Sequence, residues 1–325
     1  MFGKNPVLNI PLNLAGVSRL FSKYKKIIGV CAVVFLFAGV IIQYYRFPRY
    51  QSMPFLSFRE LKALSKNAHP SGILRWKLNR YWKTPLISNE AYYRGVKPLN
   101  LKDERLGPYL RVASWNIEKS YQMESAIKTF SSREAFRSLV DPGKAPEGSP
   151  AFNNILRQRD RLAESDIILL QEMDYGVKRS GYINAAGELA KAMNMNYTFA
   201  TEQLEVDPVM LGLEPIKMKD GSDDTEAMEY YKVDPAKYKG AFGCAVLSRY
   251  PIKRVQAFQL KNQAYDWSVQ EREKHGFFED ARRTGAELVF KNEITREIKT
   301  GGRIYFRIDL AVHAVKGRIY LFRNL

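Results

Sequence analysis

The chain has 325 residues, enough for one domain of about 200–250 residues with additional segments. Its net charge of +17 is unevenly placed: residues 1–110 carry 18 basic and 4 acidic residues, a balance of +14, and the remainder carries only +3. This distribution argues against a basic nucleic-acid groove on the folded domain and favours attraction of the N-terminal part to anionic lipid. Cys31 and Cys244 give neither a disulfide framework nor zinc-site spacing.

A hydrophobic segment follows the basic residues 1–26. Ile27 to Ile42 reads IIGVCAVVFLFAGVII and contains no charged residue. With the next three residues, the segment 27–45 reaches the ~17–20 residues that span a bilayer. A cleaved signal peptide is the alternative, but the residues after Ile42 contain no convincing small-x-small cleavage site. We therefore predict a retained signal anchor in a single-pass membrane protein whose N-terminus lies in the cytoplasm.

Basic and aromatic side chains are interleaved in residues 46–108, most densely in RWKLNRYWK at 75–83. Such a segment can stack on single-stranded nucleic acid, lie along a membrane surface, or form a strap packed on the domain. Because a hydrophobic span precedes it, we rank the membrane-surface and strap interpretations above nucleic acid. We treat residues 46–108 as a juxtamembrane linker.

From residue 109 to residue 325 the chain alternates between strand and helix patterns. The run at 166–171 is apolar at nearly every position, as expected for a strand covered on both faces. Residues 202–239 hold clustered acids and prolines, which predicts a solvated acidic insertion. We expect strands at 110–116, 166–171, 197–200, 242–248, 303–312 and 317–323, and helices at 131–139, 152–163 and 185–193.

Two of these strands end in side chains that bind hard cations. Glu172 follows the apolar run at 166–171, and Asn116 ends the first strand. Ligands of open α/β sheets bind at the carboxyl ends of strands, and Mg²⁺ needs only one or two carboxylates beside water. Glu172 is therefore a candidate metal ligand, although a surface or capping acid has the same spacing. Asn116 can bind metal or phosphate, or serve only as a turn residue, and Glu118 is either a second acid or solvent-facing.

Three segments occur in a fixed order: SWNIE at 114–118, ILLQEMD at 168–174 and GCAVLSRYPI at 243–252. Together they resemble the endonuclease/exonuclease/phosphatase (deoxyribonuclease-I-like) family over roughly residues 109–325. The resemblance implies a four-layer α/β sandwich, incomplete here, and phosphoester hydrolysis that depends on Mg²⁺ (or Mn²⁺). It further implies that Glu172 binds the metal, that Asn116 helps to hold metal and phosphate, and that Arg303 contacts the substrate phosphate.

The family's later motifs do not appear in this sequence. The segment IYLFRNL at 319–325 resembles the strand that precedes the family's first histidine, and neither the Asp-x-Asn motif nor the Asp-His pair follows. The three histidines, His69, His275 and His313, lie in a linker, a charged loop and a strand end, so they do not replace it. We therefore expect a truncated chain that is inactive by itself, since a lost general base or acid typically costs ~10²–10⁴-fold in rate.

Three functional hypotheses remain open. The first is a membrane-anchored phosphodiesterase or phosphatase acting on nucleic acid or on a phospholipid headgroup, with the anchor favouring the lipid. The second is a non-catalytic, membrane-tethered module that binds phosphate or lipid through the half-site without turnover. The third is an unrelated membrane-anchored α/β domain, which would require the ordered motifs to be a coincidence.

Overall fold

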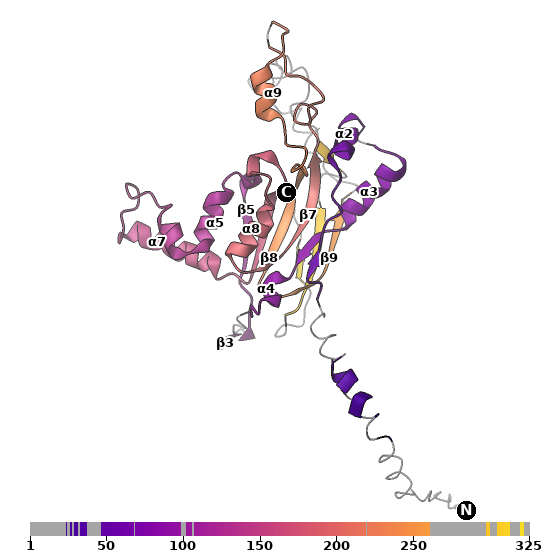
Figure 1. The fold of residues 1–325 in the computed structure, drawn as a ribbon. Helices are drawn as coiled ribbons and strands as arrows, with labels where there is room; N and C mark the ends of the chain where they lie inside the picture. Colours follow the sequence, from indigo (N-terminus) through magenta and orange to yellow (C-terminus); the bar gives the residue numbers. More distant parts are fainter. Residues whose placement is uncertain are drawn as a thin grey trace, which may run out of the picture. The chain divides into compact units, whose positions relative to one another are not determined.

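The computed structural model describes residues 24, 27, 29–31 and 33–37, residues 47–260 except 68, 99–101, 106 and 219, and residues 297–299, 304–312 and 319–321. The chain divides into two compact units, Met1–Arg46 and Phe47–Leu325 (Figure 1). Within the described part of the chain, none of the helices has the length and apolar character that a bilayer crossing requires. Residues 28, 32 and 38–45 of the expected anchor lie outside the described residues.

A seven-stranded mixed sheet forms the centre of the second unit. Its order is β1-β2-β7-β8-β6-β5, with β10 also paired to β7. The pair β5–β6 is parallel and the other pairs are antiparallel. The strands are β1 (Tyr50–Gln51), β2 (Leu86–Ser88), β5 (Val112–Asn116), β6 (Ile167–Tyr175), β7 (Asn196–Glu205), β8 (Ala241–Ser248) and β10 (Glu297–Lys299).

A second sheet packs against one face of the first. It contains β9 (Ile252–Gln259), β11 (Ile304–Leu310) and β12 (Ile319–Leu321) in the antiparallel order β12-β11-β9. Alternate residues of both sheets meet in one core, as the twofold period of strands requires. That core includes Ile167, Ala200, Val246, Val255, Phe306 and Ile308. A separate small hairpin joins β3 (Lys102–Asp103) and β4 (Gly107–Pro108).

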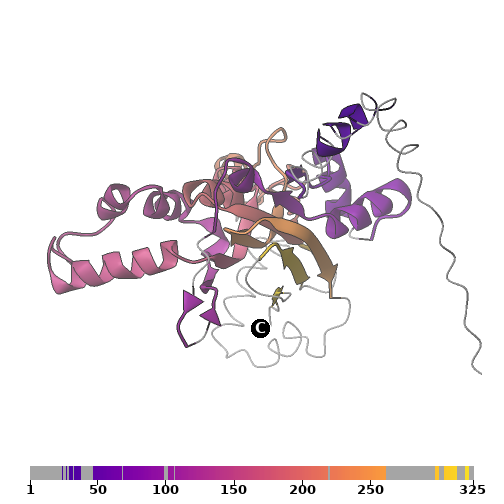
Figure 2. The ribbon, with the colours of Figure 1, turned by 90° about the horizontal axis from the view of Figure 1, so that it is seen from below.

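Helices supply the apolar side chains that cover the other face of the central sheet. Leu61 and Leu64 of α2, Tyr81 of α3 and Leu189 of α8 share one core with Phe199 of β7. In both views the α2–α3 pair lies toward one lateral edge of the central sheet, and α7 extends beyond the opposite edge (Figures 1 and 2). The helices are α2 (Phe58–Lys66), α3 (Gly72–Lys83), α4 (Glu90–Tyr93), α5 (Met123–Ser131), α6 (Arg133–Arg137), α7 (Pro150–Ala163), α8 (Ala185–Ala192) and α9 (Thr225–Tyr231), with 3₁₀ turns η1 (Glu118–Ser120) and η2 (Lys178–Ser180).

These elements confirm the α/β expectation in its coarse form. The described residues show helices, a central mixed sheet and a second packed sheet, and they do not show all four layers of the expected sandwich. Strand β6 explains why its sequence is apolar at successive positions: Ile168 and Leu170 face the helices, whereas Ile167 and Leu169 face the second sheet. The run at 166–171 is therefore a strand covered on both faces, as predicted.

The segment expected to be a juxtamembrane linker, 46–108, is largely part of the folded unit, which begins at Phe47 and not at residue 109. Its strands β1 and β2 extend the central sheet beside β7. The buried Tyr81 hydroxyl lies 2.7 Å from Thr201 Oγ1, which ties α3 to the same strand. The high density of basic residues suggested a linker. The apolar residues between them, however, recur at helical spacing and form the buried stripe by which these helices pack on the domain.

The acidic segment 202–239 is only partly a solvated insertion. Strand β7 continues through Glu205 and is buried along its whole length. Farther on, Leu211, Val233 and Tyr238 are also buried, and the Tyr238 hydroxyl donates to the Glu205 carbonyl at 2.9 Å. The segment therefore folds back on the sheet at several apolar anchors.

Candidate functional site at the ends of β5 and β6

The structure brings two of the predicted site residues together. Strands β5 and β6 run parallel with Asn116 opposite Gln171, so the carboxyl end of β5 lies beside Glu172, which is inside β6 because that strand continues to Tyr175 beyond the expected end at 171. There the Asn116 Nδ2 donates to Glu172 Oε1 at 2.8 Å. Arg303, the third predicted residue, lies outside the described residues.

The backbone at this edge adopts a conformation that side chains disfavour. Glu172 has φ of 59° and sits where the β6–β8 register shifts, between Leu170 and Met173. The neighbouring Glu118, Lys119 and Ser120 have φ of 49°, 51° and 56°. Left-handed backbone costs a residue with a Cβ about 1–2 kcal/mol, and such strain concentrates at functional sites because surrounding contacts must maintain it. Four of the six positive-φ non-glycine residues in the described part of the chain thus lie at this one strand end.

Hydrogen bonds between the two strand ends maintain this conformation. The buried Ser120 Oγ accepts from the Asp174 backbone N–H at 3.0 Å and lies 3.5 Å from the Glu172 carbonyl oxygen. The Asn116 Oδ1 accepts from the Glu118 N–H at 2.9 Å. Asn116 therefore uses its oxygen to hold the turn and its nitrogen to orient the Glu172 carboxylate.

A buried charge cluster lies directly beneath the strained turn. The Arg179 Nη2 donates to Asp174 Oδ1 at 2.6 Å, and Arg179 Nη1 donates to Glu205 Oε2 at 2.8 Å. The Asp174 side chain is fully buried, and its Oδ2 has no hydrogen-bond partner among the described residues. Arg179 also reaches the Lys119 carbonyl through Nε at 3.4 Å, so the cluster is connected to the turn above it.

Burial raises the pKa of Asp174 to about 7, against the lowering effect of Arg179. Burial by itself would lower the pKa of Arg179, but its bonds and charge interactions with Glu205 and Asp174 outweigh that effect and raise it. One guanidinium therefore faces two carboxylates, and burial favours the protonated form of Asp174 by raising its pKa.

Sequence reasoning missed this cluster, although part of a signal was present. Asp174 belongs to the ILLQEMD motif and lies in β6 just after the apolar run at 166–171, which is covered on both faces, so its charge requires a partner. The basic Arg179, five residues later, was available as that partner. Nothing in the sequence pointed to Glu205, which arrives from β7.

The donor set at the strand end is compatible with a weakly held Mg²⁺ or Mn²⁺. Glu172 offers a partly exposed carboxylate, and Mg²⁺ commonly binds through one or two carboxylates while keeping several waters. No cluster of three or more His, Cys, Asp or Glu residues suited to a metal occurs among the described residues. Glu118 is exposed beside Asn116, where it remains a candidate second acid.

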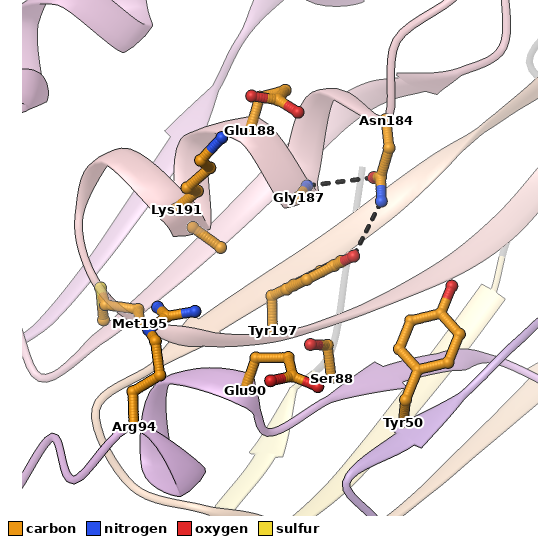
Figure 3. Close-up of a pocket in the computed structure, with 11 residues that line it drawn as sticks. Tyr50, Ser88, Glu90, Arg94, Asn184, Gly187, Glu188, Lys191, Met195 and Tyr197 are labelled. Atoms are coloured by element: carbon orange, nitrogen blue, oxygen red, sulfur yellow. Dashed lines mark hydrogen bonds between the residues drawn. The ribbon is translucent and has the colours of Figure 1, made fainter.

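A cavity of about 430 Å³ lies at the opposite edge of the sheet. Tyr197, which lines it, is at the start of β7, whereas Glu172 is near the end of β6; the two strands run in the same direction on either side of β8. Asn184 Nδ2 donates to the Tyr197 hydroxyl at 2.8 Å, and Arg94, Glu188 and Lys191 complete a mixed-charge lining (Figure 3). None of the predicted site residues lines this cavity.

Arg249, in the segment GCAVLSRYPI, has an architectural role. Its Nε donates to the Ser165 carbonyl at 3.0 Å and its Nη2 to the Ala163 carbonyl at 2.5 Å. These carbonyls belong to the end of α7 and the turn that follows, where helices leave acceptors unpaired. The SRYP motif thus fixes the helix that leads into β6.

Comparisons with known proteins found no matching family model, no matching curated protein and no matching solved structure.

Proposed function

We propose that this chain is a membrane-anchored member of the phosphodiesterases and phosphatases of the endonuclease/exonuclease/phosphatase type, inactive by itself, with its metal and phosphate half-site at Asn116 and Glu172. One observation carries the proposal: Glu172 is held in the left-handed conformation at a bulge inside β6 and is oriented there by Asn116, the last residue of the adjacent parallel strand β5. An acidic residue with only a surface role would be more stable in extended backbone, because the left-handed conformation costs free energy.

Two further features support this proposal. The ordered segments SWNIE, ILLQEMD and GCAVLSRYPI fall on β5, β6 and β8, three adjacent strands of one sheet. The central sheet also packs face to face with a second sheet, as a sandwich requires. The complete four-layer arrangement is part of the proposal.

The chemistry assigned to the site follows from its donors. Bound Mg²⁺ would neutralise charge on phosphoryl oxygens and stabilise a leaving alkoxide. Glu172 would supply the carboxylate, Asn116 would keep that carboxylate oriented and offer its amide to a phosphate oxygen, and Arg303 would add a positive charge. Mn²⁺ would serve in the same position, since it accepts the same oxygen ligands.

Membrane attachment is the second part of the proposal. The segment 27–45 would cross the bilayer once with the N-terminus in the cytoplasm, and the excess positive charge around it would favour anionic lipid. A substrate held at the membrane, such as a phospholipid headgroup, is therefore favoured over nucleic acid.

Metal binding by the full chain tests the proposal. The free energy of unfolding should increase with Mg²⁺, by about 2.7 kcal/mol at a metal concentration 100 times the dissociation constant. Glu172→Gln should abolish this increase, and Glu147→Gln, at an exposed carboxylate on another loop, should leave it unchanged. A wild-type chain indifferent to Mg²⁺ would refute the metal site, and a response retained in Glu172→Gln would remove Glu172 from it.

Turnover separates the two phosphate-binding hypotheses. Hydrolysis of bis(4-nitrophenyl) phosphate that requires both Mg²⁺ and Glu172 would support an enzyme. Mg²⁺ binding through Glu172 without measurable hydrolysis would support a non-catalytic module that binds phosphate or lipid.

A further inference from the structure

The helix pair α2–α3 carries an excess of positive charge that the candidate site does not use. Residues 58–83 contain seven basic residues and one acidic residue, Glu60. Glu60 pairs with Lys77, the only one of the seven with a carboxylate partner among the described residues. The uncompensated basic residues are Arg59, Lys62, Lys66, Arg75, Arg80 and Lys83.

Helix α3 has two distinct faces. Leu78, Tyr81 and Trp82 are buried in the domain core. The opposite side exposes Ile73, of which 75% is accessible, and Trp76, of which 59% is accessible. Spacings of three and four residues place Ile73, Trp76, Arg80 and Lys83 along one stripe of the helix. The outward stripe therefore combines two large apolar side chains with two cations.

The cations and the apolar groups of this stripe are in contact. The Arg80 guanidinium lies 5.6 Å from the centre of the Trp76 ring. An indole beside a guanidinium is suited to the boundary between lipid headgroups and acyl chains, where tryptophan is enriched and Lys or Arg side chains meet phosphate.

We propose that the outward face of α3 docks on an anionic lipid bilayer, inserting Ile73 and Trp76 at headgroup depth while the surrounding cations bind acidic headgroups. A helix with apolar side chains on a strongly basic face binds such surfaces through buried apolar area and electrostatic attraction together. This surface belongs to the compact unit that begins at Phe47, and it includes neither the segment 27–45 nor the candidate site residues Asn116 and Glu172.

The structure favours lipid over single-stranded nucleic acid as the partner. Non-specific strand binding uses successive aromatic platforms on which bases stack. The other two aromatic residues of α3, Tyr81 and Trp82, are buried in the core and are therefore not available as platforms. Ile73, the most exposed apolar residue of the helix, has no ring to stack on a base but is well suited to insertion among acyl chains.

A local reporter on the full chain tests this docking. Asn79, an exposed residue of α3, is replaced by cysteine and labelled with a fluorophore in a Cys31→Ser background, in which Cys244 is buried. The chain is added to vesicles of phosphatidylcholine alone or of phosphatidylcholine with phosphatidylserine, each containing a headgroup nitroxide quencher. Quenching then reports contact of α3 with lipid whether or not residues 27–45 insert.

We expect strong quenching on the anionic vesicles, little on the neutral ones, and loss of quenching at high salt. The double change Arg80→Glu and Lys83→Glu should weaken docking by on the order of 30-fold, about fivefold for each basic side chain. Arg157→Glu with Arg161→Glu on α7 is the matched control, because it changes the net charge equally, at exposed residues that include one in the last helical turn. Thermal unfolding of both variants verifies that the fold is retained.

Three results would overturn the proposal. The first is equal quenching on neutral and anionic vesicles, and the second is an equal loss of quenching in the α7 control. The third is fluorescence of the α3 label that does not change with vesicles but changes with a single-stranded oligonucleotide. That result would indicate that α3 binds nucleic acid.

Discussion

The two ends of the central sheet differ in backbone strain: one end carries the strained candidate site, and the other carries a cavity without comparable strain. Where β5 ends beside Glu172 of β6, four non-glycine residues are held in left-handed backbone above the partly buried Arg179, which pairs with two carboxylates. At the start of β7 there is a cavity of about 430 Å³, and the positive-φ residue near it, Asn194, is of a type that tolerates this conformation. The strained end is the better candidate for function, because strain persists only where other contacts enforce it.

Breaking the charge cluster at the strained end should cause a large loss of stability. Arg179→Ala would leave Asp174 and Glu205 buried without a counter-charge and should lower the free energy of unfolding by about 3 kcal/mol. Arg157→Ala, at an exposed site on α7, should change it by less than about 0.5 kcal/mol. Denaturant titration measures the free energy of unfolding of both variants. Similarly small losses in the two would show that the Arg179 cluster does not stabilise this part of the fold.

The pH dependence of stability should reveal the protonated Asp174. Its folded pKa of about 7 exceeds its ordinary value of 3.8, so the folded state binds more protons between pH 4 and pH 7. Its contribution is therefore complete below pH 4 and is lost as the pH rises towards 7, by at most about 4 kcal/mol. Relative to the wild type, Asp174→Asn should become more stable across this window. Parallel pH profiles for the two proteins would contradict the assignment.

The cavity end depends on a glycine. A Cβ at Gly187 would lie 2.5 Å from Asn184 Nδ2 and 2.9 Å from the Tyr197 hydroxyl. Alanine normally stabilises a helix interior by about 1 kcal/mol, but here overpacking should reverse the sign and destabilise the protein by about 1–2 kcal/mol. Adding Asn184→Ser, which keeps a helix-capping oxygen in a smaller side chain, should recover part of the loss. An increase in stability of Gly187→Ala would contradict this prediction, because it would mean that Asn184 and Tyr197 move aside at little cost.

The smallest effect measures the strain itself. Lys119→Gly relieves left-handed backbone at an exposed side chain and should raise the free energy of unfolding by about 0.5–1 kcal/mol. The same change at Lys128, inside helix α5, should lower it by about 1 kcal/mol. If both lysine variants lose stability equally, the turn after β5 is not strained in solution.

The family resemblance implied a shared role for Asn116 and Glu172, and the structure places the two side chains in contact. The sequence also predicted most strands of the central sheet, since their apolar runs are long and bounded by breakers. It placed a helix at 131–139, where the structure has the shorter α6 (Arg133–Arg137), and it missed α5 (Met123–Ser131), which ends just before Ser132. Ser132 is extended, and its side chain accepts from the Ala135 N–H, so it caps a second helix within the same amphipathic run.

Local pattern by itself therefore determined the α/β class, the strand cores and two side chains of the candidate site, because these depend on alternation and on strand ends. Only the tertiary structure decided that residues 47–98 complete the sheet, that Glu205 reaches Arg179 from β7, and that Glu172 occupies left-handed backbone. Each of these depends on a contact or conformation set by strands far apart in the chain. The spacing of residues along the sequence does not specify which distant strands pair. Those pairings are determined by how the strands and helices pack in the folded protein.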